Sequence, residues 1–176
     1  MSRDLIKETG VIDPRKQMTL EDYAELSRQA DEYGIFRFVL TGGEAILDKN
    51  LGGLIDALDP MKHLLILDTN AWFFDHKKAK WFADLGGYKV QISLDSFVEE
   101  EHDSFRNKPG SYKRVIKSIQ ASKDAGLELL LSTCIIKDRV FSQEFQDFLE
   151  YCETEDVPLY VTLAKPVGSA RGHDEW

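Results

Sequence analysis

Several side chains that could bind a small ligand come directly after short apolar runs of this chain. Thr41-Gly42-Gly43-Glu44 follows the run at residues 35–40. Two adjacent glycines let a ligand approach the backbone closely. Exposed carbonyl groups beside the carboxylate of Glu44 would suit an ammonium group. A Gly-Gly pair also turns the chain in many proteins, so both interpretations stay open.

A second group of polar side chains lies in and after the run at residues 90–95. Strand alternation places Gln91, Ser93 and Asp95 on one face. Such a face on a buried strand must either be satisfied by hydrogen bonds or take part in binding. Arg106 follows, and its guanidinium can hold a carboxylate with two parallel hydrogen bonds. A lone arginine in a loop is, however, usually a surface residue.

The other polar residues carry weaker signals. Asp68-Thr69-Asn70 could bind a ligand or form an Asx-type turn, and we favour the turn. We expect Trp72 and Trp81 in the core. Phosphate-loop, nucleophile-elbow and dinucleotide fingerprints are absent from the sequence. The four histidines lack metal-ligand spacing, and we expect them at the surface: His63, His76, His102 and His173.

The composition limits the function classes. The chain has 176 residues, 43% of them hydrophobic, with a net charge of −9 that disfavours binding to phosphate backbones. Its apolar runs are far shorter than the ~20 residues of a membrane span, and no signal sequence opens it. We therefore expect a cytoplasmic protein with no nucleic-acid or membrane partner. Cys134 and Cys152 match no zinc pattern.

Apolar runs alternate with amphipathic segments along the chain. We take the chain as one domain over residues 1–176, with an irregular lead-in at 1–17 and a tail at 173–176. This alternation predicts βαβ units and a parallel sheet, either doubly wound or part of a barrel. In both architectures ligands bind at the carboxyl ends of the strands. The expected strands are 35–40, 64–67, 89–94, 127–136 and 159–163, and the expected helices are 20–33, 51–58, 77–85, 111–125 and 142–154.

Taken in order, these segments resemble the core domain of the radical SAM (S-adenosylmethionine) superfamily. The resemblance covers about residues 18–172. Each motif is weak alone, but their order and spacing together are fairly specific. The matching segments are Met18–Asp22, Phe38–Glu44, Asp68–Asn70, Ile92–Ser96, Glu101–Asp103 with Arg106, Gly110–Ile116 and Pro166–Gly172.

The resemblance implies an α/β fold, a partial (β/α)₆ TIM-like barrel of parallel strands that binds S-adenosylmethionine at the strand carboxyl ends. It also implies that the parent enzyme cleaves this cofactor reductively to a 5′-deoxyadenosyl radical, which abstracts hydrogen from an unknown small molecule or peptide. By resemblance, the cofactor-binding residues are Gly42, Gly43 and Glu44 for the methionine amino group, Ser93 and Arg106 for the carboxylate or ribose, Asn70 and Asp95 in matching motifs, and Leu163 near the adenine.

The chain also departs from the family pattern. Ala45 stands where proline is usual, and Ala71 where glycine is frequent after Thr-Asn. No C-x-x-x-C-x-x-C loop is present, because no cysteine precedes Cys134. We therefore expect a 4Fe-4S cluster in the parent protein only, and no metal ligands in this chain.

The first strand and the cluster loop of the family would lie before Met1, so we expect an inactive fragment of a longer protein. The alternative is a cluster-free α/β binding or interaction domain. A phosphate-ligand barrel enzyme fits the acidic composition less well. Without a first strand, the edge of residues 35–40 would be exposed and would favour dimerisation.

Overall fold

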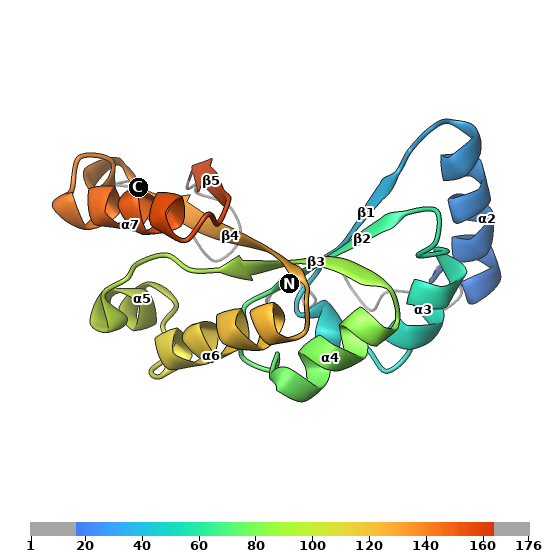
Figure 1. Ribbon diagram of the computed structural model, residues 1–176, viewed down its shortest axis with the longest axis horizontal. Coiled ribbons are helices and arrows are strands. Elements are labelled where there is room, and N and C mark those ends of the chain that lie inside the picture. Colours follow the sequence, from blue (N-terminus) through green and yellow to red (C-terminus); the bar gives the residue numbers. More distant parts are fainter. Residues whose placement is uncertain (1–16, 164–176) are drawn as a thin grey trace.

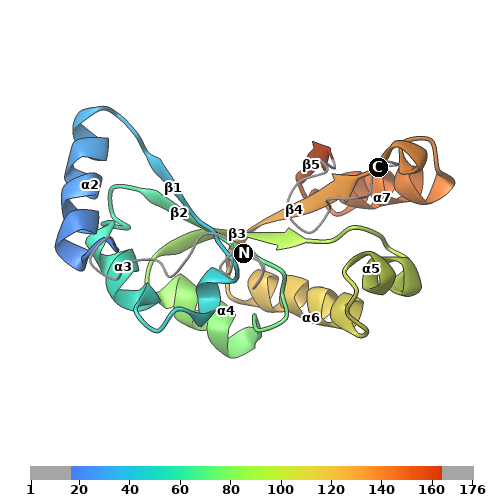
Figure 2. The same cartoon turned by 180° about the vertical axis from the view of Figure 1, so that it is seen from behind.

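Five parallel strands form one curled sheet in the computed structural model, which describes residues 17–163 (Figures 1 and 2). The spatial order follows the chain order, and every neighbouring pair is parallel. A doubly wound sheet would reverse its order and carry helices on both faces. The sequential order therefore defines a half-barrel. The strands are β1 (Arg37–Leu40), β2 (Leu64–Thr69), β3 (Gly87–Ser93), β4 (Glu128–Ile135) and β5 (Leu159–Leu163).

Helices connect the strands, and α3 to α6 lie along one side of the curled sheet (Figure 1). The predicted helices are confirmed to within a few residues, whereas α5 and the two 3₁₀ helices found between residues 17 and 163 were not predicted. None of the described helices is long and apolar enough to span a bilayer. The helices are α2 (Leu20–Glu32), α3 (Leu51–Ala57), α4 (His76–Asp84), α5 (Glu99–Phe105), α6 (Ser111–Asp124) and α7 (Gln143–Thr154), with 3₁₀ helices η2 (Ala45–Leu47) and η3 (Lys137–Arg139).

Local sequence signals explain where helix α2 begins and ends. At its start, the backbone N–H of Asp22 donates to the Thr19 hydroxyl at 3.2 Å, and the backbone N–H of Thr19 donates to the Asp22 carboxylate at 2.7 Å. This reciprocal pair is a capping box. After the helix, Gly34 adopts a φ of +71°, a conformation that glycine takes without steric cost.

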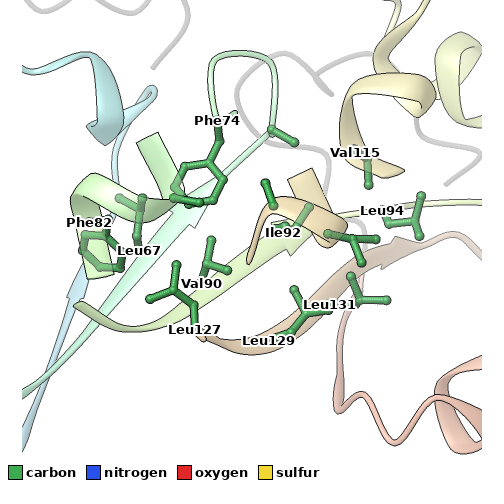
Figure 3. Packing of buried hydrophobic residues seen from close by; sticks show 14 of the residues in the cluster. Leu67, Phe74, Phe82, Val90, Ile92, Leu94, Val115, Leu127, Leu129 and Leu131 are labelled. Atoms are coloured by element: carbon green, nitrogen blue, oxygen red, sulfur yellow. The ribbon is translucent and has the colours of Figure 1, made fainter. Parts of the chain in front are cut away.

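The core lies between the middle strands and the helices that cover them (Figure 3). Val90, Ile92 and Leu94 are fully buried on the helix side, as the alternation of this segment predicts. Phe82 of α4 and Val115 of α6 are equally buried against them. Burial of these side chains holds β3 in place, so the core fixes where the strand's carboxyl end presents its polar residues.

The opposite, concave face of the sheet carries polar side chains. Residues paired in a parallel register point to the same face, so three pairs form a polar strip across β2 to β5. No helix of the described residues covers this strip (Figures 1 and 2). The register pairs are Asp68 with Gln91, Ser93 with Ser132, and Cys134 with Thr162.

Strand β1 forms one margin of the sheet. Within the described residues it pairs with β2 alone. Val39 is 45% exposed and Phe36, just before the strand, is 63% exposed. The expected exposed edge is therefore present.

Candidate functional site

The loop after β1 is joined to the end of β2 through one carboxylate. Half-buried Glu44 accepts a hydrogen bond from the Thr69 hydroxyl at 2.5 Å and another from the backbone N–H of Asn70 at 3.1 Å. Each carboxylate oxygen keeps a further lone pair, so the group can still accept from an ammonium ligand. Beside it, Gly42 adopts a φ of +139°, and a Cβ at this position would meet no atom within 4 Å. The loop therefore offers open space next to a fixed negative charge.

The segment after β2 is a tight polar turn. Thr69 Oγ1 accepts from the backbone N–H of Ala71 at 3.0 Å, and Asn70 Oδ1 accepts from that of Trp72 at 2.9 Å. The Asx-type turn favoured by the sequence is therefore confirmed. The amide N–H₂ of Asn70 makes no bond to any described residue, so it can still donate to a ligand.

The two departures from the family pattern have a structural context. Ala71 adopts a φ of +66°, the left-handed region that favours glycine. Ala45 is the first residue of η2, a position at which proline fits well because its fixed φ suits the first turn. The chain thus keeps both backbone conformations without the residues that favour them.

A second polar centre lies at the end of β3. Asp95 is fully buried, and its Oδ1 accepts from the backbone N–H of Cys134 at 3.1 Å. Its Oδ2 accepts from Nε of Arg106. The backbone N–H of Asp95 donates to Nδ1 of His102 at 3.1 Å. Asp95 therefore joins the ends of β3 and β4 to helix α5.

The expectation of four surface histidines is wrong for two of them. His63 is 2% exposed and packs against Phe38, with 5.0 Å between ring centroids, and His102 is 1% exposed. Burial lowers the pKa of His102, although the nearby Asp95 carboxylate acts in the opposite direction. His76 is exposed as expected, and His173 lies outside the described residues.

Helix α5 and the start of α6 are connected through Asp103. Its carboxylate accepts from the backbone N–H of Tyr112 at 2.8 Å, from the Ser111 hydroxyl at 2.9 Å and from the backbone N–H of Gly110. Desolvation raises the pKa of Asp103, but these hydrogen bonds outweigh it, so the pKa lies below its ordinary value. The Glu-His-Asp segment thus fixes α5 against both β3 and α6.

A pocket of about 410 Å³ lies between the turn after β2 and the start of α6. Above the Trp72 ring, Lys108 Nζ lies 4.3 Å and the Arg114 guanidinium 5.1 Å from the centroid. Trp72 therefore lines a positively charged pocket instead of joining the core, whereas half-buried Trp81 packs against the core as expected. The lining residues are Asn70, Trp72, Phe73, Arg106, Lys108 and Ser111.

Most of the predicted site residues lie close together. Asn70 connects Glu44, through the bond above, to the pocket that Arg106 lines. Ser93 is the last residue of β3 and lies two residues before Asp95. Gly42 and Gly43 lie in the loop that carries Glu44. Leu163 stands apart: it ends β5, is 71% exposed and pairs with Ile135, a residue of the helix-facing side.

Asp68, on the concave strip, is a further unusual residue. Its Oδ1 is buried and has no hydrogen-bond partner among the described residues. Burial raises the pKa of Asp68, opposed by a hydrogen bond from the Thr41 side chain. This unpaired oxygen could not be predicted, because strand alternation alone does not show which polar groups stay unpaired.

The residues of the chain fit S-adenosylmethionine but not an iron–sulfur cluster. The C-x-x-x-C-x-x-C loop of the family supplies three cysteine ligands to its cluster, whereas the sequence has two cysteines and no such loop. Cys134 lies on β4 and Cys152 on α7. Among the described residues, no group of three or more His, Cys, Asp or Glu side chains could hold a metal ion. Glu44 and Arg106, by contrast, offer opposite charges near Asn70, as a zwitterionic ligand requires.

Parallel strands, outer helices and polar strand ends together define the chain as part of a (β/α)-barrel core. The chain belongs to the radical SAM superfamily, whose family model matches residues 6–152.

Sequence relatives agree with this membership. The chain is 27% identical over 163 residues to GTP 3',8-cyclase 2 of Pseudomonas aeruginosa, covering 91% of the chain and 49% of the relative. It is 30% identical over 149 residues to GTP 3',8-cyclase of Helicobacter pylori, covering 84% of the chain and 46% of the relative. The chain thus spans about half the length of these curated relatives.

Solved structures share the fold. Streptococcus suis SuiB aligns with a TM-score of 0.69 at 18% identity, covering 89% of the chain and 36% of SuiB. The anSMEcpe structure with bound AdoMet aligns with a TM-score of 0.65 at 16% identity, covering 82% of the chain and 43% of anSMEcpe. These similarities confirm the partial TIM-like barrel.

Proposed function

We propose that the chain is the S-adenosylmethionine-binding core of a longer radical SAM enzyme. The observation that carries this proposal is the placement of opposite charges on either side of Asn70. Glu44 accepts from the Asn70 backbone, and Arg106 lines the pocket to which Asn70 contributes. The amino acid part of S-adenosylmethionine carries an ammonium and a carboxylate, which these two side chains complement.

In this proposal the chain's own residues bind and orient the cofactor. The Gly42-Gly43 backbone and Glu44 hold the amino group, and Arg106 holds the carboxylate. Ser93 faces the ribose, whereas Leu163, which lies apart on the helix-facing side, has no role in this proposal. In the full enzyme, S-adenosylmethionine held by these residues beside a reduced cluster would supply a radical for hydrogen abstraction. The cluster ligands lie outside the 176 residues, so this chain alone binds the cofactor without cleaving it.

The substrate of the full enzyme is a small molecule or a peptide. One structure that shares the fold is SuiB bound to the precursor peptide SuiA, and the curated relatives above are GTP 3',8-cyclases. The concave strip around Gln91 and Ser132 offers hydrogen-bonding groups next to the cofactor site. We also propose that the protein is cytoplasmic. Because its net charge of −9 repels phosphate backbones, we propose that it has no nucleic-acid partner.

Equilibrium dialysis tests the binding proposal. The chain should bind S-adenosylmethionine at least about tenfold more tightly than 5′-methylthioadenosine, because the latter lacks the amino acid group that Glu44 and Arg106 contact. A tenfold difference in affinity corresponds to ~1.4 kcal/mol. Equal affinities would favour the alternative of a cluster-free α/β binding or interaction domain. Anaerobic treatment of the same chain with iron and sulfide should give no cluster absorbance, and its appearance would contradict the assignment of the ligands.

We further propose that the exposed edge of β1 pairs with a second copy of the chain. An unpaired strand edge presents free N–H and C=O groups to such a partner. Sedimentation equilibrium should detect a dimer, which Val39→Lys should weaken by about tenfold or more by placing a charge on the edge. Val161→Lys on β5 is the control, since Val161 is similarly exposed at 41%. A monomer at every concentration, or equal effects of both variants, would refute pairing through β1.

A further inference from the structure

Arg106 is held through one edge of its guanidinium and free at the other. Its Nε donates to Asp95, while its two terminal nitrogens bond no described residue. The side chain is 30% exposed and lines the 410 Å³ pocket. A planar guanidinium that is fixed on one edge presents the remaining N–H groups in a defined direction.

Asp95 is shielded from direct contact with a ligand in this arrangement. The side chain has no exposed surface, and both of its oxygens accept hydrogen bonds, from Cys134 and from Arg106. The resemblance to the family suggested a direct role in cofactor binding for Asp95. Its burial instead indicates a role through Arg106.

His102 holds the backbone of the segment that carries Asp95 in place through a hydrogen bond. Its Nδ1 accepts from the Asp95 backbone N–H, so that nitrogen bears no proton. The 3.8 Å between Nδ1 and Asp95 Oδ2 therefore joins two acceptors and is no ion pair. His102 is neutral, and Arg106 remains the cation that pairs with the Asp95 carboxylate. His102 also precedes Arg106 by one turn of α5, and its carbonyl accepts from the Arg106 backbone N–H at 2.9 Å.

We propose that Asp95 and His102 are positioning residues that direct the free edge of Arg106 into the pocket, where it takes a ligand carboxylate with two parallel hydrogen bonds. The ligand class is an α-amino carboxylate. This inference rests on the proposed function, in which that ligand is S-adenosylmethionine. A guanidinium already fixed by Asp95 loses less conformational freedom on binding than a mobile one would.

The test compares S-adenosylmethionine with its decarboxylated form by calorimetric titration of the full 176-residue chain. The unaltered chain should bind S-adenosylmethionine about tenfold or more tightly than the decarboxylated form. Asp95→Asn keeps an acceptor for Cys134 but removes the charge that holds Arg106. This variant and His102→Ala should reduce the preference to about twofold or less, because they weaken binding of S-adenosylmethionine more than binding of the decarboxylated form.

Matched variants separate positioning from general loss of structure. His102→Asn places an amide oxygen where Nδ1 accepts and should restore most of the preference. Arg106→Lys keeps the charge without the planar fork and should lose the preference, and this partly exposed side chain can be replaced without disturbing the core. His63→Ala removes another buried histidine far along the chain and should keep the preference. Full preference in Asp95→Asn, His102→Ala or Arg106→Lys would overturn the inference.

A second measurement keeps the inference testable if the chain fails to bind either compound, an outcome that refutes the proposed function. The Nε–H of Arg106 should give an NMR signal protected from exchange with water, since it is bonded to buried Asp95. The signal should lose protection in His102→Ala and keep it in His63→Ala. A freely exchanging signal in the unaltered chain would refute positioning by Asp95.

Discussion

Replacing Glu44 by glutamine is expected to weaken S-adenosylmethionine binding by roughly 1.5–3 kcal/mol, about a 10- to 150-fold rise in Kd. The substitution removes the negative charge that faces the ammonium group and leaves one oxygen to accept from Thr69 or Asn70. The β1–β2 connection should therefore persist while the charge-assisted bond to the ligand is lost. Calorimetric titration of the purified chain measures the change.

Glu128→Gln is the matched control for this substitution. Glu128 is an exposed glutamate at the start of β4, at the opposite end of its strand from the site. It should leave the Kd unchanged. Equal losses in the two variants would show that overall charge, and not the position of Glu44, governs binding.

Gly87→Ala is expected to destabilise the fold by about 1–3 kcal/mol, the range for overfilled cores. A Cβ at Gly87 would lie 2.4 Å from Cε1 of Phe82, whose ring is fully buried beneath β3. Either the ring or the strand must move, and both belong to the core that positions the site. Urea unfolding followed by circular dichroism measures the loss.

Gly52→Ala provides the opposite expectation within the same chain. Gly52 lies in α3, and an added Cβ would meet the Trp81 side chain at an ordinary 3.6 Å. Alanine in a helix is favoured over glycine by roughly 0.5–1 kcal/mol, so this variant should be stabilised. A stable Gly87→Ala variant would mean that the Phe82 ring packs differently from the structure described here.

The parallel sheet could be predicted from the sequence because the strands are short, largely apolar segments that alternate with amphipathic helices. Helix α5 escaped prediction for a physical reason. Its seven residues have no apolar repeat, and tertiary bonds from His102 and Asp103 hold it in place. A sequence pattern shows an apolar repeat, but it does not show tertiary hydrogen bonds. The three glutamates of its first turn were the available hint, since carboxylates favour helix N-termini.

The candidate site could likewise be predicted only in part. Glu44 and Asn70 each follow a strand, and adjacent parallel strands bring such loops together. The pairing of Asp95 with Arg106 could not be predicted, because it depends on how α5 folds back on β3. The position of Trp72 was missed similarly: whether an aromatic side chain enters the core depends on the turn that precedes it.

The most direct test of the account is a calorimetric titration of S-adenosylmethionine into the 176-residue chain and its Glu44→Gln/Arg106→Ala double variant. The account predicts one binding site in the unaltered chain and no measurable binding in the double variant, with both proteins equally folded by circular dichroism. An affinity that is the same in both proteins, or no binding to the unaltered chain, would contradict the proposed role of these residues.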